Sequence, residues 1–256
     1  MSHASPVAVV SGAGRGIGRG IALRLAADGY EIVGTFNRDE ASAEQAAKAV
    51  ADLGRECRMV RSDAADPDAA AALAQAVLDE FGRVDALVLN AGIASRGRTV
   101  ADTDPAEIQK VLSVHALGAF YLCSNFAPAI RNSERGAIVL ISSTTAARPS
   151  PGGAPYMMGK VALEALGRTL ALEEQPHGTR VNIVAPGLVA TDMGDRLARA
   201  ITGAADAATL DAEMPFGRVT RPEDVAELVA FLISDRAALI TGQRIEVHAG
   251  RPSITH

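Results

Sequence analysis

Short apolar runs alternate with helical segments along almost the whole chain. Runs such as VAVVS (7–11) and DALVLN (85–90) are typical of strands that are covered on both faces of a sheet. Between such runs, apolar residues recur at helical spacing, as at Ile17, Ile21 and Leu25. The predicted strands are residues 7–11, 31–36, 57–61, 85–90, 137–142, 180–185 and 244–248, and the predicted helices are residues 17–29, 39–53, 67–81, 105–131, 154–175 and 222–233.

This alternation predicts a single α/β domain over residues 1–256. Such a pattern forms a mostly parallel, doubly wound sheet of about seven strands, with helices on both faces. Ligands of such sheets bind outside the carboxyl ends of the strands. Residues 188–216 have the weakest pattern, with a mixed helical tendency at 195–202. We expect this segment to be either a lid over the ligand end or a pair of surface helices, and the sequence favours neither.

Composition and charge exclude several classes of function. The chain of 256 residues is 48% hydrophobic and 21% charged, which is ordinary globular usage, and its net charge is −5. No dense run of Lys and Arg indicates nucleic-acid binding, and no uninterrupted apolar run has the length of a membrane span. Cys57 and Cys123 form no metal-binding or disulfide pattern. We therefore expect a cytoplasmic protein that binds no metal, nucleic acid or membrane.

A glycine-rich stretch, SGAGRGIG (11–18), lies between the first predicted strand and the first predicted helix. Gly12, Gly16 and Gly18 allow a tight turn and let a ligand approach the backbone. The helix that begins there offers free N–H groups and the positive end of its dipole to a pyrophosphate. Such a loop alone can also serve packing, but its position after a first strand indicates a dinucleotide site.

The residues after the second predicted strand bear on the choice of cofactor. An NAD site often has an acidic residue there, which binds the ribose hydroxyls. This chain reads Phe36-Asn37-Arg38, and Arg15 of the glycine loop should lie near the same place. Two guanidinium groups suit the 2′-phosphate of NADP, so we predict NADP, with NAD as the alternative. Arg38 could instead be a solvated charge, and Asp39 is expected to cap the next helix.

Tyr156 and Lys160 stand four residues apart in APYMMGK (154–160), on a predicted helix. At this spacing the two side chains share one face. A phenol beside an ammonium group ionises more easily than a phenol alone, so the pair is a candidate proton donor. Pairs of this kind also share a face by chance, and the spacing by itself does not decide between the two interpretations.

Together these motifs resemble the short-chain dehydrogenase/reductase family. The glycine loop, LNAG (89–92), Ser143 thirteen residues before Tyr156, and APG (185–187) follow one another in that family's order, over about residues 7–250. The resemblance implies that Tyr156 is the acid/base, that Lys160 favours the tyrosinate and holds the nicotinamide ribose, and that Ser143 hydrogen-bonds the substrate oxygen. With Asn37 and Arg38 added from the cofactor argument, the implied cofactor-binding set is Gly12, Arg15, Gly16, Ile17, Gly18, Asn37, Arg38, Asp63, Ala64, Asn90, Ala91, Gly92, Tyr156, Lys160, Pro186, Gly187, Val189 and Thr191.

Some of these residues also have a purely structural interpretation. Ser143, like its neighbour Ser142, could satisfy backbone groups at a strand end, and Asn90 could be a turn residue. The family often has an Asn in the middle of the long helix, supporting a water that relays protons to the Lys, whereas this chain has His115. Imidazole can also donate and accept, so His115 is a candidate relay residue whose charge could change activity near neutral pH. It could equally be a satisfied interior side chain.

The end of the chain also departs from the family. The usual ending resembles V-x-G-G, and this chain has VHAGRPSITH. In the family this tail is near oligomer contacts, and we expect a homo-oligomer, either a dimer or a tetramer.

The expected function is hydride transfer between NADP and a carbonyl or secondary alcohol, as in bacterial 3-oxoacyl-carrier-protein reductases. An NAD-dependent alcohol, sugar or steroid dehydrogenase is the alternative, and a non-catalytic cofactor sensor or scaffold is an alternative of another class. Enoyl reductases space their Tyr and Lys farther apart than the four residues found here, and nucleotide-sugar epimerases are usually longer. The expected substrate pocket comprises Ile93, Ala94, Ser95, Arg96, Thr145, Ala147, Gly153 and parts of 188–216. Arg96 and Arg148 could attract an anionic substrate or the acidic carrier of a thioester, but we interpret both as surface charges.

Overall fold

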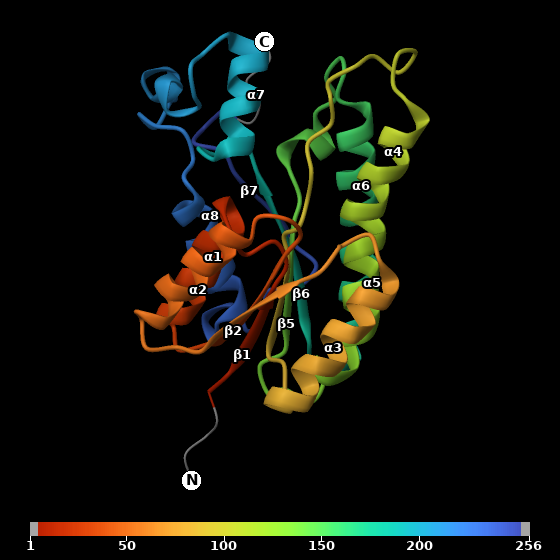
Figure 1. Ribbon diagram of the computed structural model, residues 1–256, viewed down its shortest axis with the longest axis vertical. Coiled ribbons are helices and arrows are strands. Elements are labelled where there is room, and N and C mark those ends of the chain that lie inside the picture. Colours follow the sequence, from red (N-terminus) through yellow and green to blue (C-terminus); the bar gives the residue numbers. More distant parts are fainter. Residues whose placement is uncertain (1–4, 252–256) are drawn as a thin grey trace.

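A computed structural model describes residues 5–251, and Figure 1 shows their arrangement. Seven strands form one parallel sheet in the order β3-β2-β1-β4-β5-β6-β7. The strands are β1 (Val7–Val10), β2 (Glu31–Phe36), β3 (Cys57–Arg61), β4 (Ala86–Leu89), β5 (Ala137–Ile141), β6 (Arg180–Pro186) and β7 (Arg244–Val247). The order reverses between β1 and β4, which is where such sheets bind ligands. The predicted doubly wound parallel sheet is confirmed.

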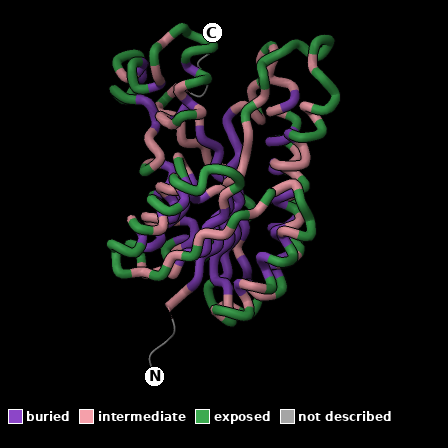
Figure 2. Tube along the Cα trace, in the orientation of Figure 1, coloured by how far each residue is buried: buried purple, intermediate pink, exposed green. Residues whose placement is uncertain are grey.

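Helices cover both faces of the sheet. They are α1 (Gly16–Ala27), α2 (Glu40–Ala51), α3 (Pro67–Phe81), α4 (Pro105–Leu112), α5 (Gly118–Ile130), α6 (Ala154–Glu174), α7 (Asp192–Thr202) and α8 (Pro222–Ile233). On one face α1 packs between α2 and α8, and on the other α3 packs on α5 and α4 on α6 (Figure 1). The five inner strands, from β2 to β6 across the sheet, are the most buried part of the chain, because both of their faces carry apolar side chains into these layers (Figure 2). The edge strands β3 and β7 are less buried.

Side chains cap the first turns of four of the eight α-helices in the described residues. Asp39, Asp66, Asp104 and Thr191 each accept a hydrogen bond from a backbone N–H at the start of α2, α3, α4 and α7. The expected cap at Asp39 is thereby confirmed. Helix α1 differs, because no side chain among the described residues caps it at Arg15 and its first turn has no acidic residue. The N–H groups at its start therefore remain available to a ligand.

The helix predicted at residues 105–131 is interrupted by a π-helical turn, η1 (Ser113–Leu117), between α4 and α5. A π turn holds one more residue than an α turn and re-aims the side chains around it. It places His115 inside the molecule, where 2% of the residue is exposed. Gly118, just after the turn, lies so close to the carbonyl oxygen of Ala64 that any larger side chain would overlap with it. This close packing is a tertiary constraint, which the periodicity of the sequence does not carry.

Residues 188–216 are more ordered than the sequence pattern predicts. They contain α7 and a short 3-10 helix, η4 (Ala208–Glu213). The segment has a small hydrophobic cluster of its own, formed with Val219, whose members are Leu188, Ala198, Ala207, Leu210, Met214 and Val219. Helix α7 begins at the Thr191 cap, which explains why it starts before the helical tendency at 195–202. Movement of this segment as a lid stays a prediction.

Within the described residues, one helix has the length and apolar composition of a membrane span. It is the stretch Pro105–Ile130, with a mean hydropathy of 1.2. This stretch packs against α3 and α6, as a core helix does. Core helices of proteins can have the same length and apolar composition, so this stretch is weak evidence for a membrane span.

The chain turns sharply after β7, and this turn departs from the family's ending. Ala249 has a φ of 53°, and it is the one non-glycine residue with a positive φ in the described part of the chain. This conformation brings the Cβ of an L-residue close to its own backbone, at a cost of about 1–2 kcal/mol. The family's V-x-G-G ending has a glycine at this position. Residues 252–256, which complete the unusual tail, lie outside the described residues.

We predict that Ala249→Gly stabilises the protein by about 0.5–1 kcal/mol, because relief of the strain outweighs the larger unfolded-state entropy of glycine. Denaturant unfolding measures the change. The matched control is Gly250→Ala, which should destabilise the protein, since Gly250 has a φ of 82° and its Cβ would lie 2.9 Å from that of Pro215. A lower unfolding free energy for Ala249→Gly would contradict the argument.

Candidate active site

Tyr156 and Lys160 lie one turn apart on α6, on the face that meets the sheet. The Lys160 Nζ atom is 5.7 Å from the centre of the Tyr156 ring. Lys160 is 3% exposed, and its Nζ donates a hydrogen bond of 2.7 Å to the carbonyl oxygen of Ile141, at the end of β5. This bond holds the start of α6 at the carboxyl edge of the sheet, where ligands bind.

The two serines that follow β5 have different partners. Ser142 donates its hydroxyl to the Glu164 Oε1 atom at 2.7 Å. The Ser143 Oγ atom accepts from the backbone N–H of Thr145 at 3.2 Å and donates to the Thr145 hydroxyl at 3.1 Å. The Ser143 hydroxyl also lies beside Tyr156, where a hydrogen bond lowers the pKa of the phenol. Of the two serines, Ser143 is thus the one placed next to Tyr156.

Burial controls the protonation of both Tyr156 and Lys160. It raises the pKa of Tyr156 to about 12, and the bond from Ser143 offsets only part of this change. It lowers the pKa of Lys160 to about 7, against the opposing effect of the Glu164 carboxylate. The easier ionisation of Tyr156 expected from its spacing to Lys160 is therefore not found in this structure. The phenol keeps its proton at neutral pH, which suits a proton donor.

His115 contacts the same pair from the π turn. Its ring meets the Tyr156 ring edge-on, with centroids 5.3 Å apart. Its Nε2 atom lies 2.8 Å from the carbonyl oxygen of Ile93 and 3.1 Å from the Ile93 nitrogen. Burial, reinforced by the charge of Lys160, lowers the pKa of His115 to about 3. The expected change of charge near neutral pH is therefore wrong, because His115 is already neutral there.

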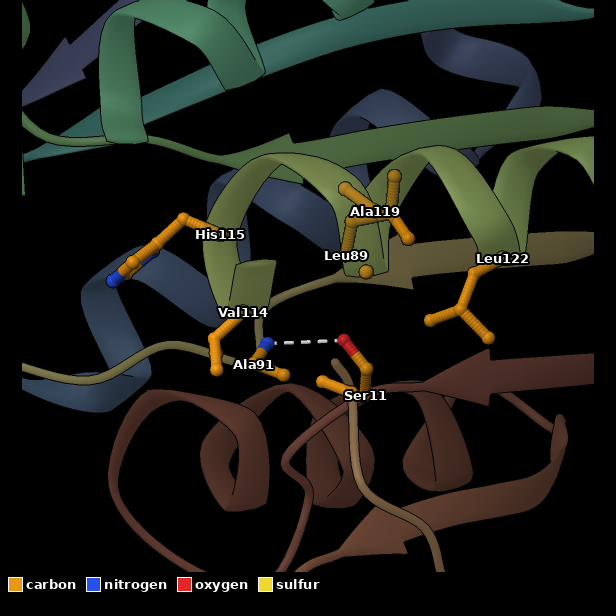
Figure 3. Close-up of a pocket in the computed structure, with 9 residues that line it drawn as sticks. Ser11, Leu89, Ala91, Val114, His115, Ala119 and Leu122 are labelled. Atoms are coloured by element: carbon orange, nitrogen blue, oxygen red, sulfur yellow. Dashed lines mark hydrogen bonds between the residues drawn. The ribbon is translucent and has the colours of Figure 1, made fainter. Parts of the chain in front are cut away.

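A small cavity lies beside His115, between the π turn and the ends of β1 and β4 (Figure 3). Its volume is about 10 Å³, which is roughly the space that one water molecule needs. The lining residues are Ser11, Ala64, Leu89, Ala91, Val114, His115, Gly118, Ala119 and Leu122. The Ser11 hydroxyl accepts hydrogen bonds of 2.9 Å from the backbone N–H groups of Asn90 and Ala91. The structure thus brings Ala64, Ala91 and His115, which are distant in sequence, to one place.

The glycine loop is held by Asn90. The Asn90 side chain donates to the carbonyl oxygens of Ser11 at 2.9 Å and Gly12 at 3.2 Å. Gly12 and Gly16 have positive φ values of 69° and 55°, and a Cβ on Gly18 would overlap with the Gly12 carbonyl. Asn90 is therefore more than a strand-end turn residue, since it fixes the loop over the start of α1.

The start of α1 fits the pyrophosphate of a dinucleotide. Its N–H groups and its dipole are left uncapped by the described side chains, which is what an anion requires. Ile17 lies in this first turn and packs on the core, and Thr191 is 3.3 Å from the place a Cβ on Gly16 would occupy. Any cofactor at this end would thus meet the glycine loop on one side and the start of α7 on the other.

The predicted adenosine side carries charges of both signs. The Arg15 guanidinium is 3.4 Å from the Asp192 carboxylate and 3.8 Å from that of Asp39, all of them exposed. Arg38 is also exposed. Arg61, at the end of β3, donates to the carbonyl oxygen of Asn37 at 3.1 Å. This bond places a further basic side chain beside Asn37 that the sequence pattern did not single out.

The remaining predicted cofactor residues lie at the same edge of the sheet. Asp63 closes a turn by accepting from the N–H of Ala65 at 3.0 Å. The His115 ring packs directly on Gly92, where a Cβ would lie 3.1 Å from the Nδ1 atom. The absence of a side chain at this position therefore lets the ring approach the LNAG turn. Pro186 ends β6, and the Gly187 N–H donates to the Val247 carbonyl at 2.9 Å. Val189 forms a bridge with Thr220.

The expected substrate-lining residues come from three segments around Tyr156. Ile93, Ala94, Ser95 and Arg96 follow β4, Thr145 and Ala147 lie in the 3-10 helix η2 (Thr144–Ala147), and Gly153 precedes α6. Arg96 is 4.0 Å from Glu107, and Arg148 is 2.8 Å from Glu246. Each arginine is thus matched by a carboxylate, in keeping with their interpretation as surface charges.

Comparison with known proteins places this chain in a large group of oxidoreductases. Residues 12–251 match the family described as enoyl-(acyl carrier protein) reductase. The chain is 34% identical over 243 residues to the 3-oxoacyl-acyl-carrier-protein reductase FabG of Staphylococcus aureus, covering 95% of this chain and 96% of that one. A short-chain dehydrogenase of Burkholderia cenocepacia in complex with NADP has a TM-score of 0.86 at 32% identity, over 96% and 97% of the two chains.

A carveol dehydrogenase of Mycobacterium avium in complex with NAD has a TM-score of 0.88 at 28% identity, over 96% and 97% of the two chains. Similar folds therefore hold either nicotinamide cofactor. The match over nearly the whole chain, at this identity and with this sheet and glycine loop, shows that the protein belongs to the short-chain dehydrogenase/reductase family of oxidoreductases.

Proposed function

We propose that this chain is an NADP-dependent ketone reductase that acts on a small molecule with a 3-oxoacyl-type carbonyl group. The observation that carries the proposal is the Tyr156 phenol, which keeps its proton at neutral pH with a pKa of about 12 and lies beside Ser143 and Lys160. A group of this kind suits donation of a proton to a carbonyl oxygen. The resemblance to a 3-oxoacyl-acyl-carrier-protein reductase supports the choice of substrate class.

Each residue around Tyr156 would have a separate role in the reduction. The bound nicotinamide supplies the hydride. Ser143 hydrogen-bonds the substrate oxygen as negative charge develops, and Tyr156 gives that oxygen its proton. Lys160 donates one N–H to the Ile141 carbonyl oxygen. Its other N–H groups remain for the nicotinamide ribose and for stabilising the phenolate that forms. His115, neutral and in contact with Tyr156, is proposed to support a water-mediated relay to Lys160.

Two catalytic alternatives are less well supported. The matching family is described by its enoyl reductases, but the Tyr156–Lys160 spacing of four residues with Ser143 upstream favours a carbonyl reductase. An NAD-dependent alcohol dehydrogenase has support from Asp39, an exposed carboxylate at the adenosine side. Against it, Arg15, Arg38 and Arg61 gather near the end of β2, where a 2′-phosphate would lie.

We further propose that the protein works as a homo-oligomer in the cytoplasm. Large apolar side chains are exposed on the outer helices, among them Phe120 of α5, which is 53% exposed, and Leu172 of α6, which is 72% exposed. A subunit contact over these helices would remove such side chains from water. Cys57 and Cys123 are free thiols, and burial raises the pKa of Cys123 to about 12, so a reducing compartment suits both.

We predict that Tyr156→Phe lowers kcat for carbonyl reduction by about 10²–10⁴-fold, because the proton donor is lost while the ring and its packing stay. Binding of NADPH, followed by nicotinamide fluorescence, should be unchanged. Tyr121→Phe removes a phenol from α5 and serves as the control, with no loss of activity expected. Full biological function of a Tyr156→Phe protein would favour the cofactor sensor instead.

We predict tighter binding of NADPH than of NADH, and a loss of about tenfold in NADPH affinity for Arg38→Gln, since one charge-assisted contact to the 2′-phosphate disappears. NADH affinity should not change in this variant. Because the chain has no Trp, nicotinamide fluorescence can be followed against a low background. Arg135→Gln, at an exposed arginine that follows α5, is the matched control. Tighter binding of NADH by the unaltered protein would reverse the cofactor assignment.

We predict that kcat/KM for carbonyl reduction falls as the pH rises through about 7. Lys160 has a pKa of about 7 and Tyr156 one of about 12, so only the lysine loses its proton between pH 5 and 9. The uncharged amine no longer stabilises the phenolate that forms as the proton leaves. His115→Asn should keep the same midpoint, because the pKa of His115 is about 3. A midpoint that moves in this variant would assign the titration to the histidine.

A further inference from the structure

Charged residues alternate along β7, one of the two edge strands of the sheet. Arg244 and Glu246 are two residues apart on the strand, and His248 follows its end. Residues at this spacing share one face of a strand. None of the three belongs to the glycine loop or to the Ser143, Tyr156 and Lys160 group, so none has a role in the proposed cofactor binding or proton transfer.

All three nitrogens of the Arg244 guanidinium are engaged. Its Nε donates to Glu164 Oε1 at 2.7 Å, its Nη1 to Glu246 Oε1 at 2.6 Å, and its Nη2 to the carbonyl oxygen of Ser143 at 3.1 Å. The side chain is 17% exposed. Because the guanidinium is planar and its donors have fixed directions, three acceptors around it define one orientation. One of these acceptors is the backbone of the residue whose hydroxyl lies beside Tyr156.

Glu164 connects this arginine to the helix that carries the proton donor. It lies one turn after Lys160 and two turns after Tyr156 on α6, is 4% exposed, and also accepts from the Ser142 hydroxyl. A carboxylate this deeply buried needs a cationic partner, and Arg244 is the more buried of its two arginine partners. The arginine therefore links α6 to the segment that begins with Ser142 and Ser143.

Glu246 fixes the other end of the same segment. Besides Arg244, it accepts from the Arg148 guanidinium at 2.8 Å, and Arg148 directly follows the 3-10 helix η2. Both ends of η2 are thus bound to β7, at Ser143 through Arg244 and at Arg148 through Glu246. Between these two points lie Thr145 and Ala147, the expected substrate-lining residues.

We propose that Arg244 is a positioning residue for the reduction, which fixes the backbone of Ser143 and so the place of its hydroxyl relative to the Tyr156 phenol. The proposal rests on the role proposed above for Ser143. A rotation of the Ser143 peptide would move the hydroxyl away from the substrate oxygen, and small misplacements of a reacting group are costly. Arg244 itself touches neither substrate nor cofactor in this scheme.

A double-mutant cycle tests this inference. Arg244→Met should lower kcat/KM for carbonyl reduction by about ten- to hundredfold. In a Ser143→Ala background, the same change should cost less than about twofold, because the hydroxyl that Arg244 positions is already absent. NADPH affinity should be the same in all four proteins, which separates positioning of Ser143 from a general disturbance of the fold.

Arg168→Met is the matched control. Arg168 also donates to Glu164, at 2.8 Å, but to the other carboxylate oxygen, and its side chain is 56% exposed on α6. Its removal should leave kcat/KM within about twofold of the unaltered protein, as expected for an exposed ion pair. An Arg168→Met loss as large as that of Arg244→Met would overturn the inference, since it would assign the effect to Glu164 alone.

The other outcomes are also decisive. Losses from Arg244→Met that are equal in both backgrounds would show that Arg244 does not act through Ser143, and would leave the proposed function intact. An unchanged kcat/KM in Ser143→Ala alone would overturn the role of Ser143 and this inference with it. Should Arg244→Met fail to fold, Arg244→Lys keeps a charge opposite Glu164 but cannot span three acceptors, and the same cycle with this variant should give the same loss.

Discussion

The hydrogen bond from Lys160 to the carbonyl oxygen of Ile141 fixes one helix on the end of one strand, and the candidate site is arranged around it. A buried amine must be satisfied, and a carbonyl at the end of a strand ladder has a lone pair to accept from it. With this contact in place, Tyr156 lies one turn before it and meets Ser143, while Glu164 lies one turn after it and meets Ser142. The four-residue spacing along α6 thus places Tyr156, Lys160 and Glu164 on one face, next to the serines that follow β5.

Desolvation around this contact also sets the protonation states of the neighbouring side chains. The same burial that lowers the pKa of Lys160 raises that of Tyr156 and keeps His115 neutral. Tyr156 is therefore a protonated phenol and His115 an uncharged imidazole at neutral pH, and of the three groups only the Lys160 amine changes its charge there. The π turn contributes to this state, because it is the turn that carries the His115 ring to the Tyr156 ring.

Sequence reasoning was accurate where the signal is local. The strands, the capped helices and the glycine loop follow from apolar periodicity and from residues such as Asp39 that act on their own helix. It failed where a contact joins distant segments. The ion pairs that Arg15 forms with Asp39 and Asp192 were not expected, and the long helix is interrupted where Gly118 packs against Ala64. Local pattern also gave no reason to expect that a charge on β7 would reach Ser143.

By itself the sequence determined the parallel sheet, the glycine loop that leads into α1 and the shared face of Tyr156 and Lys160, because each depends on spacing within about ten residues. Only the tertiary structure decided the protonation states and the partners of the charged side chains. Arg244 and Ser143 are 101 residues apart in sequence, and the neutral state of His115 depends on burial between η1, α6 and the LNAG turn. Burial and long-range hydrogen bonds exist only once the chain is folded, so no local pattern records them.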